Sequence, residues 1–337
     1  METTQPRNIT TADALFNDPT DSIDLVIRTT DNVDFFVLSG LLCLKSPSSF
    51  FRHVLQTNQH TEERDSLPVL DVKEDSEAFR IILLLCYPCG PPEIKSVEQL
   101  VTVGKALNKY CMDYAWKRFV QTLIASSLIK EQALRIFAHA VANGWKELGE
   151  VAAKNTLYVP LDALETELED LRCIDALQYV RLREYHRKCG RAAQAIVTMT
   201  PKNIRMLWLK EKMSELLFLQ PSIGSKIHVP CRWCGGYIGG RPCVLGDVLD
   251  QNVFYMHDNW LSDYLSAVMA EALRRPCPEV TLGENIIAQA IMKSISLCNH
   301  VEWSAIASNQ IHRFATLVAE EIDRLISLEP LNVDWTK

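Results

Sequence analysis

Short apolar runs separated by polar turns mark the N-terminal part of the chain. Runs rich in Val, Ile, Leu and Phe are typical of strands. The segments that fit this pattern are residues 24–29, 35–38 and 69–72. Asp31 and Asn32 lie between the first two runs, and both residue types tolerate the left-handed backbone of a turn, so a hairpin is predicted there. A helical pair over 41–55 and an exposed polar loop over 56–66 are expected before the third strand.

Apolar residues recur at helical spacing after the third strand. Asp75 is predicted to cap an apolar helix that stops at Pro88, and Ser96 with Gln99 forms a capping box for the next helix. Gly144 is a predicted helix C-cap, and the helix that begins near Ile174 is expected to end at Gly190. The remaining helices are expected over 113–124, 131–143, 145–157, 161–171, 192–199, 259–274 and 303–328, with a further one opened by a capping box at Thr281 and Glu284.

Residues 221–250 interrupt this helical pattern. They hold nearly half of the 13 glycines, together with Ile, Val and aromatic side chains. A loop-rich insert within a folded domain is therefore expected, because a plain linker would lack the apolar residues. At 337 residues, two domains are the expectation. The predicted division is a mobile arm over 1–20 and folded regions over 21–125, 126–220 and 221–337.

Charge and hydropathy exclude several classes of partner. The net charge of −7, from 35 basic and 42 acidic residues, argues against a general nucleic-acid surface. No apolar run approaches the ~20 residues of a membrane helix. The first residues are polar and lack the hydrophobic region of a secretory signal, so a cytoplasmic or nuclear protein is expected. The densest basic group fits either a solvated helix face or phosphate binding; it comprises Arg181, Arg183, Arg187, Lys188 and Arg191.

The 11 cysteines of an intracellular chain are expected to be reduced thiols or metal ligands. Cys231 and Cys234 stand two residues apart before a pair of glycines, the form of a zinc knuckle. Cys298 and His300 are the best candidates to complete four ligands around a structural zinc. Cys243, His257 and Cys277 are held in reserve. Plain buried thiols are the alternative, and a redox pair is disfavoured because glycines rather than a helix follow Cys234.

The order of segments over residues 21–125 resembles a BTB/POZ domain, and it is most similar to the expanded set of such proteins in mushroom-forming fungi. The resemblance rests on the strand at Asp24–Thr29, the segment Leu67–Phe79 and the apolar helix that ends at Tyr87-Pro88. It continues into the helical region after the BTB domain. The similar segments there are 134–140, 152–157, 179–189, 260–265 and 320–322.

The resemblance implies an α+β N-terminal domain, a small sheet covered by helices, followed by a mostly α-helical C-terminal domain with the Cys- and Gly-rich insert. It implies homodimer formation through Leu15, Phe16, Leu41 and Leu42, although Leu41 and Leu42 fit the core equally well. Many such domains carry a basic pair after the second strand. Ser39 and Gly40 stand there in this chain, so Asp24 is expected to cap local backbone instead.

In similar proteins a second pair of cysteines often lies near the position of Cys298. Val301 occupies the fourth position of that motif here, so His300 would have to substitute. The knuckle is therefore half of a zinc site by motif alone.

The predicted function is non-enzymatic protein–protein interaction, with the BTB domain for self-association or scaffold docking and the helices for a partner. The first alternative is a substrate adaptor of a cullin-type ubiquitin ligase. Glu62, Glu63 and Asp65 supply acids in the exposed loop for that role, but no hydrophobic anchor stands beside them. The second alternative is a metal-dependent enzyme at the C-terminal cysteines. No nucleotide-binding or hydrolase motif is present, and Cys189 with His186 is a nucleophile and base by spacing only.

Overall fold

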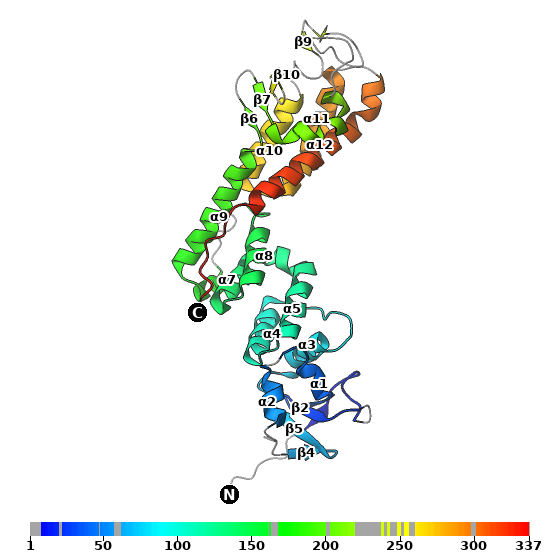
Figure 1. Ribbon diagram of the computed structural model, residues 1–337, viewed down its shortest axis with the longest axis vertical. Helices are drawn as coiled ribbons and strands as arrows, with labels where there is room; N and C mark the ends of the chain where they lie inside the picture. Colours follow the sequence, from blue (N-terminus) through cyan, green and yellow to red (C-terminus); the bar gives the residue numbers. More distant parts are fainter. Residues whose placement is uncertain are drawn as a thin grey trace. The chain divides into compact units, whose positions relative to one another are not determined.

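The computed structural model divides into two compact units, residues 1–152 with 335–337 (unit 1) and residues 153–334 (unit 2) (Figure 1). The residues described are 8–19, 22–46, 48–56, 62–160, 162, 168–199, 203–219, 237–238, 241–242, 248–250, 253–255, 260–297 and 301–336. The boundary expected at residue 125 falls inside unit 1, and the four predicted ranges stay predictions. Each unit is described by itself.

A curled five-stranded mixed sheet forms one part of unit 1, in the order β1-β3-β2-β5-β4. The predicted hairpin is confirmed: β2 and β3 pair antiparallel, with Val26 opposite Phe36, and Asn32 between them has a φ of +59°. The third predicted strand, β5, pairs parallel to β2. The strands are β1 (Thr10–Thr11), β2 (Leu25–Arg28), β3 (Val33–Val37), β4 (Glu62–Arg64) and β5 (Leu67–Asp71).

Strand β4 corrects the expectation of a polar loop over 56–66. Its residues Glu62–Arg64 pair antiparallel with β5. All three side chains are charged, so no apolar alternation signals the strand. Backbone pairing with β5 and ion pairs with the neighbouring strands hold the strand in place. Residues 57–61 lie outside the described part of the chain.

Helices make up the rest of unit 1, and their predicted caps are largely confirmed. Asp75 accepts a hydrogen bond from Ala78 N (2.8 Å), and Ser96 accepts one from Gln99 N (3.2 Å). The Gln99 side chain returns to Lys95 N (2.9 Å), one residue before the expected partner. The helices are α1 (Ser39–Leu42), α2 (Phe50–Gln56), α3 (Ser76–Cys86), α4 (Val97–Lys109), α5 (Asp113–Ala125), α6 (Leu128–Glu131), α7 (Ala133–Asn143) and α8 (Lys146–Thr156), the last of which crosses residue 152.

Aromatic side chains join the sheet to these helices. Phe79 of α3 lies 5.9 Å from Phe35 of β3 and 6.4 Å from Phe51 of α2, measured between ring centroids. Phe51 also lies 4.9 Å from Tyr110, which follows α4. All four rings are buried. Burying such rings contributes several kcal/mol each, so the sheet and the helices of unit 1 share one core.

Trp335, near the C-terminus, packs inside unit 1. Its ring stands edge-on to Phe137 of α7 (6.4 Å between centroids) and lies directly over Gly149 of α8. A Cβ at Gly149 would lie 2.2 Å from the indole, so glycine is required for this approach. Gly144, the predicted C-cap of α7, has a φ of +71° and is confirmed.

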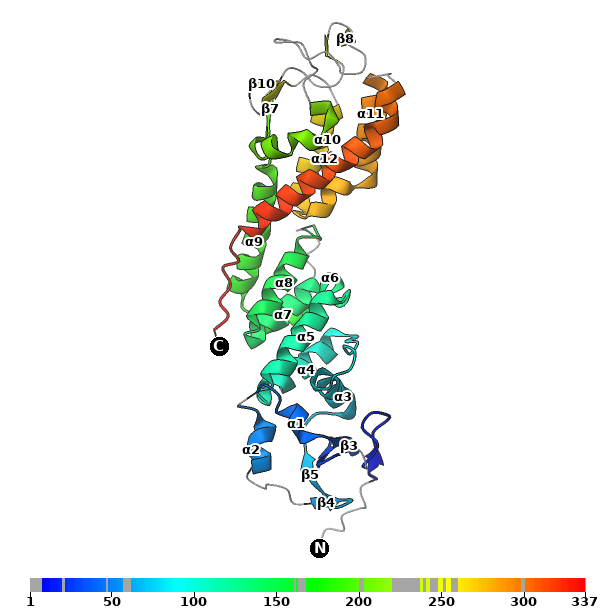
Figure 2. The same ribbon diagram turned by 45° about the vertical axis from the view of Figure 1, so that its right-hand side comes forward.

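Unit 2 is built on four long helices and short 3-10 segments (Figure 2). Trp260, Tyr264 and Phe314 form its aromatic centre, with Phe218 at 5.2 Å from Trp260. The helices are α9 (Ala176–Gln194), α10 (Trp260–Arg274), α11 (Glu284–Leu297) and α12 (Val301–Ser327). The 3-10 segments are η2 (Glu169–Cys173), η3 (Leu207–Glu215), η4 (Leu217–Leu219) and η5 (Pro278–Leu282). The mostly helical second part is therefore confirmed.

Two predicted helix boundaries in unit 2 are wrong. Gly190 lies within α9 instead of ending it, and its Cα faces the backbone of Leu273, whose carbonyl oxygen would lie 3.2 Å from an added Cβ. Thr281 lies in η5 rather than capping a helix, because its hydroxyl donates to Ala315 O (3.0 Å). Gly190 and Thr281 each contact another helix that is distant in the sequence, and the neighbouring residues alone do not predict such contacts.

The separate helix expected over 192–199 is wrong: residues 192–194 are the end of α9, and Thr198–Met199 form a short strand. Further short strands lie after it and within part of the insert. One sheet has four strands in the order β10-β11-β7-β6, and a second pairs β8 with β9. The strands are β6 (Thr198–Met199), β7 (Asn203–Arg205), β8 (Tyr237–Ile238), β9 (Arg241–Pro242), β10 (Val248–Asp250) and β11 (Val253–Tyr255). The rest of the insert, and most of the helix expected over 161–171, lie outside the described residues. Among the helices described, none is both long and apolar enough to cross a membrane.

Candidate interaction surface

Three leucines around the short helix α1 stand partly exposed at a spacing of three residues. Leu38 and Leu44 are 37% and 38% exposed, and Leu41 between them is half-buried. We call these residues the leucine ridge. Leu41 lies within α1, Leu38 is the extended residue before the helix, and Leu44 follows the C-cap Cys43, so the ridge is a short, partly exposed apolar segment around the helix. Exposed apolar surface of this kind is a candidate contact site for a partner.

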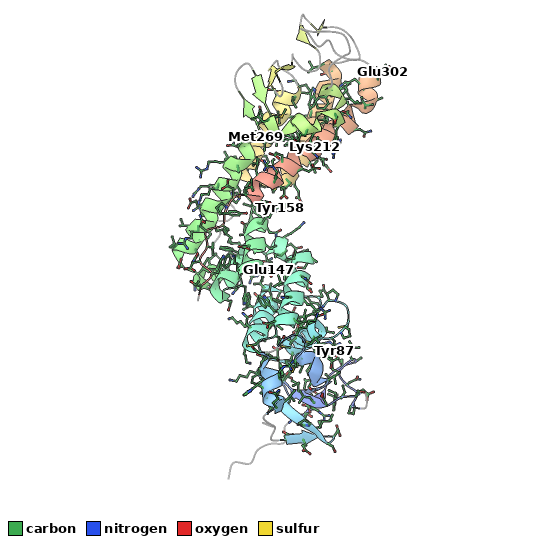
Figure 3. All side chains as sticks on the ribbon, viewed as in Figure 1. Tyr87, Glu147, Tyr158, Lys212, Met269 and Glu302 are labelled. Carbon is green, nitrogen blue, oxygen red and sulfur yellow. The ribbon has the colours of Figure 1, made fainter. Side chains whose placement is uncertain are left out.

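Polar side chains fix the start of α1. The Asp24 carboxylate accepts hydrogen bonds from the Ser39 amide and hydroxyl, both at 2.7 Å. The Leu38 amide donates to the Tyr87 hydroxyl at 2.8 Å (Figure 3 labels Tyr87). The expectation that Asp24 caps local backbone is therefore confirmed. These bonds satisfy amides that have no partner within the helix.

The other end of α1 is tied by α2 and by the turn before it. Arg52 donates to Cys43 O (3.0 Å), and the Ser46 hydroxyl donates to Leu44 O (3.2 Å). A guanidinium bond to a carbonyl of the last turn also suits the negative end of the helix dipole. The leucine ridge is thus held at both ends before any partner binds, which lowers the entropic cost of docking.

The four predicted interface residues fall into two groups. Leu15 is 67% exposed and Leu41 is half-buried, so both are accessible. Phe16 and Leu42 are buried; Phe16 packs edge-on against Tyr87 (5.1 Å between centroids). These two residues support the surface from beneath, and their role in an interface stays a prediction. Sequence reasoning missed Leu38 and Leu44, although their spacing from Leu41 was visible.

A buried ion cluster lies on the sheet of unit 1. Arg28 of β2 donates to both oxygens of Asp34, its cross-strand partner on β3, at 2.7 and 2.9 Å. Arg28 also donates to Glu62 (2.7 Å), and Arg64 pairs with Asp34. Hydrogen bonding to Asp34 raises the pKa of Arg28 against the opposing effect of burial. The cluster binds β4 to the central strands through charge.

Two buried cysteines, Cys86 and Cys189, lack the features of a reactive thiol. Burial raises the pKa of Cys86 and of Cys189 to about 12, so both are protonated at neutral pH. His186 shares a hydrogen bond with Val159 O (3.1 Å), and burial lowers its pKa. Cys189 instead bonds with Tyr185. The arrangement therefore gives Cys189 and His186 no activated nucleophile.

The predicted zinc ligands are not described by the structure. Cys231, Cys234, Cys298 and His300 lie outside the described residues, as do Cys243 and His257. Cys277 is described and buried. Within the described ranges, no three His, Cys, Asp or Glu side chains lie close enough together to hold a metal ion. The structural zinc stays a prediction.

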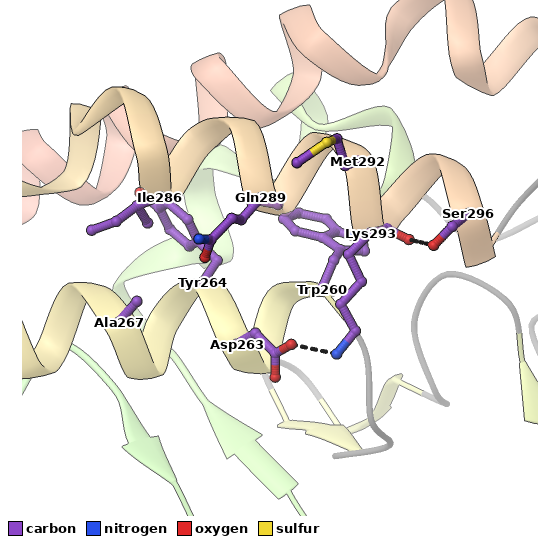
Figure 4. A pocket seen from close by; sticks show the side chains of 10 residues that line it. Trp260, Asp263, Tyr264, Ala267, Ile286, Gln289, Met292, Lys293 and Ser296 are labelled. Atoms are coloured by element: carbon purple, nitrogen blue, oxygen red, sulfur yellow. Dashed lines mark hydrogen bonds and ion pairs between the residues drawn. The ribbon is translucent and has the colours of Figure 1, made fainter.

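A pocket of about 470 Å³ opens between α10 and α11 of unit 2 (Figure 4). Its lining mixes Trp260 and Met292 with an ion pair between Asp263 and Lys293. The pair crosses from α10 to α11 and so links the two helices. The ionic groups neutralise each other, which leaves the pocket no charge with which to select a ligand.

No protein-family model matches the sequence, and no curated protein matches it.

Proposed function

We propose that unit 1 is a BTB/POZ-type interaction module that forms a homodimer through the leucine ridge, and that unit 2 presents a helical surface to a protein partner. The observation that carries this proposal is the ridge itself. Leu38, Leu41 and Leu44 are accessible in and beside a short helix whose two ends are fixed by side-chain hydrogen bonds.

The arrangement of unit 1 supports the proposal. The elements follow one another in the order that the resemblance implies: a hairpin, a helical pair, a strand parallel to β2, and three further helices. The ridge lies on the helix after the second strand of that hairpin, where the resemblance implies a dimer contact.

The cullin-adaptor alternative receives less support. Glu62, one of its three candidate acids, already accepts from Arg28, and Asp65 lies 3.7 Å from Arg64. Both carboxylates therefore already interact with arginines of the sheet. The metal-enzyme alternative rests on residues outside the described ranges.

Replacing Leu41 and Leu44 by Lys should dissociate the dimer. Each leucine buried at an interface contributes roughly 1.5–3 kcal/mol, so the pair should weaken dimerisation by more than about a hundredfold. Sedimentation velocity of the full chain over a range of concentrations measures this. Ile124→Lys, at another exposed apolar position of unit 1, is the matched control and should leave the dimer intact. Equal sedimentation of the Leu41/Leu44 variant and wild type, with unchanged circular dichroism, would rule out the ridge as the interface.

A further inference from the structure

A positively charged groove of about 430 Å³ lies in unit 2, between the C-terminal part of α9 and the end of α10. Among the described residues, three arginines line it, two from α9 and one from α10, together with one acid. The lining residues are Pro160, Asp162, His186, Arg187, Arg191, Leu273 and Arg274.

The charges of the two α9 arginines are not neutralised locally. Arg187 and Arg191 lie four residues apart on one face of the helix, and the side chain of neither forms a hydrogen bond or ion pair with any part of the chain that the structure describes. Glu184, the acid nearest to them on this helix, pairs with Lys188 instead (3.3 Å). The guanidinium groups of Arg187 and Arg191 are therefore available to bind an anionic ligand.

Arg274 adds a third guanidinium from the other side. Its carboxylate partner, Glu271, is 3.3 Å away, but the same carboxylate accepts a shorter bond of 2.6 Å from Arg275. One carboxylate thus serves two arginines and leaves a surplus positive charge. His186 contributes none, because burial lowers its pKa and its ring bonds to Val159 O. That bond also anchors the backbone beside Pro160 at the rim.

The exposed face of α9 carries two apolar residues beyond Glu184, on the side away from the groove. Leu177 and Val180 are 55% and 52% exposed, and they share a face with Arg187 and Arg191 at spacings of three, seven and four residues. At 1.5 Å per residue, Val180 lies roughly 10 Å along the helix from Arg187. An extended peptide covers that distance with about three residues.

We propose that this groove binds the phosphoryl group of a phosphorylated side chain in a protein partner, and that the flanking residues of the partner lie along α9. Guanidinium groups bind phosphate oxygens in pairs of parallel hydrogen bonds, which is the strongest mode of phosphate recognition by side chains. The described residues of the lining include no Phe, Tyr or Trp on which a nucleobase would stack, and Leu273 with Val180 offers contacts for apolar side chains. The proposal rests on the partner-binding role of unit 2, and dimerisation of unit 1 does not enter it.

Fluorescence polarisation of the full chain with a labelled peptide tests this proposal. The probe carries phosphoserine with a leucine three residues away, and its unphosphorylated form is the comparison. We expect the phosphopeptide to bind at least about tenfold more tightly, since the phosphoryl group forms charge-assisted hydrogen bonds with the guanidiniums that the unphosphorylated serine cannot form. Arg187→Gln with Arg191→Gln should remove that preference, and inorganic phosphate should compete. Arg181→Gln, which removes a charge from the same helix outside the groove, should leave it unchanged.

Equal affinity for the two peptides would overturn the proposal, and so would full binding by the double variant. Preferential binding to vesicles of phosphatidylcholine and phosphatidylserine, with no phosphopeptide preference, would also overturn it and assign the arginines to a membrane surface. Because sedimentation measures the dimer separately, a failed peptide assay leaves self-association unaffected.

Discussion

Asp34→Ala should destabilise unit 1 by about 3–5 kcal/mol, the usual cost of leaving a buried charge without its partner. Asp34 is fully buried and accepts two of the three guanidinium bonds of Arg28, which is itself 2% exposed. Removing the carboxylate leaves Arg28 with Glu62 alone and deprives Arg64 of its buried partner. Strands β2, β3 and β4 should all lose protection, because the cluster joins them. Hydrogen exchange of these strands, together with the midpoint of urea unfolding, measures the effect.

Two comparisons separate this effect from loss of any acid. Asp263→Ala removes the exposed partner of Lys293 and should cost no more than about 1 kcal/mol. Replacing Arg28 by Met and Asp34 by Leu together should cost less than Asp34→Ala alone, since no unpaired buried charge remains. If Asp34→Ala and Asp263→Ala shifted the unfolding midpoint equally, the ion cluster would have no special role in the sheet.

Gly104→Val should destabilise unit 1 by about 1–3 kcal/mol, or more if the helices separate. Gly104 lies in α4, and a Cβ there would stand 2.6 Å from the indole of Trp145. Trp145 is buried and lies 5.3 Å from Trp116 between ring centroids, so its ring has little room to move. Overpacking therefore opposes the gain that glycine replacement usually gives a helix. Thermal unfolding followed by circular dichroism detects the loss.

A size exchange tests the cause. Trp145→Phe shortens the ring at the contact, so Gly104→Ala should cost less in that background than in the wild type. Gly90→Ala is the matched control, because no atom lies within 4 Å of its added Cβ, and it should change the unfolding midpoint little. Additive effects of Gly104→Ala and Trp145→Phe would contradict the proposed clash.

Local signals in the sequence predicted much of the fold correctly. Asp75 and Ser96 cap helices, Gly144 ends one with positive φ, and Asn32 turns the hairpin. Each of these residues acts on backbone within a few positions of itself, so its role is readable from nearby residue types. Taken in order along the chain, such signals predict the fold class, an α+β region and then a mostly helical one.

Features that depend on distant contacts were missed. Strand β4 consists of charged residues, and its partners are β5 and the buried Arg28. Glycine is typical of a helix end, yet Gly190 lies within α9. Its lack of a side chain instead leaves room for the backbone of Leu273. Strands β7 and β11 pair across about fifty residues of sequence, and this joins the local pair β6–β7 to the local pair β10–β11. No local pattern encodes these encounters.

The candidate site was predicted in part. Leu15 and Leu41 are accessible, but the ridge also needs Leu38 and Leu44, whose exposure depends on how α1 is anchored. Arg187 and Arg191 were visible as part of a basic run. Their convergence with Arg274 required the packing of α9 against α10.

Native mass spectrometry of the full-length chain tests the central claim of self-association most directly. The account predicts a dominant species at twice the 38.2 kDa chain mass, which falls to the single-chain mass in the Leu41/Leu44 lysine variant. Any zinc bound at the cysteines adds a discrete mass to each chain in the same spectrum. A single-chain mass for the wild type at micromolar concentration would contradict the dimer, and with it the role assigned to the leucine ridge.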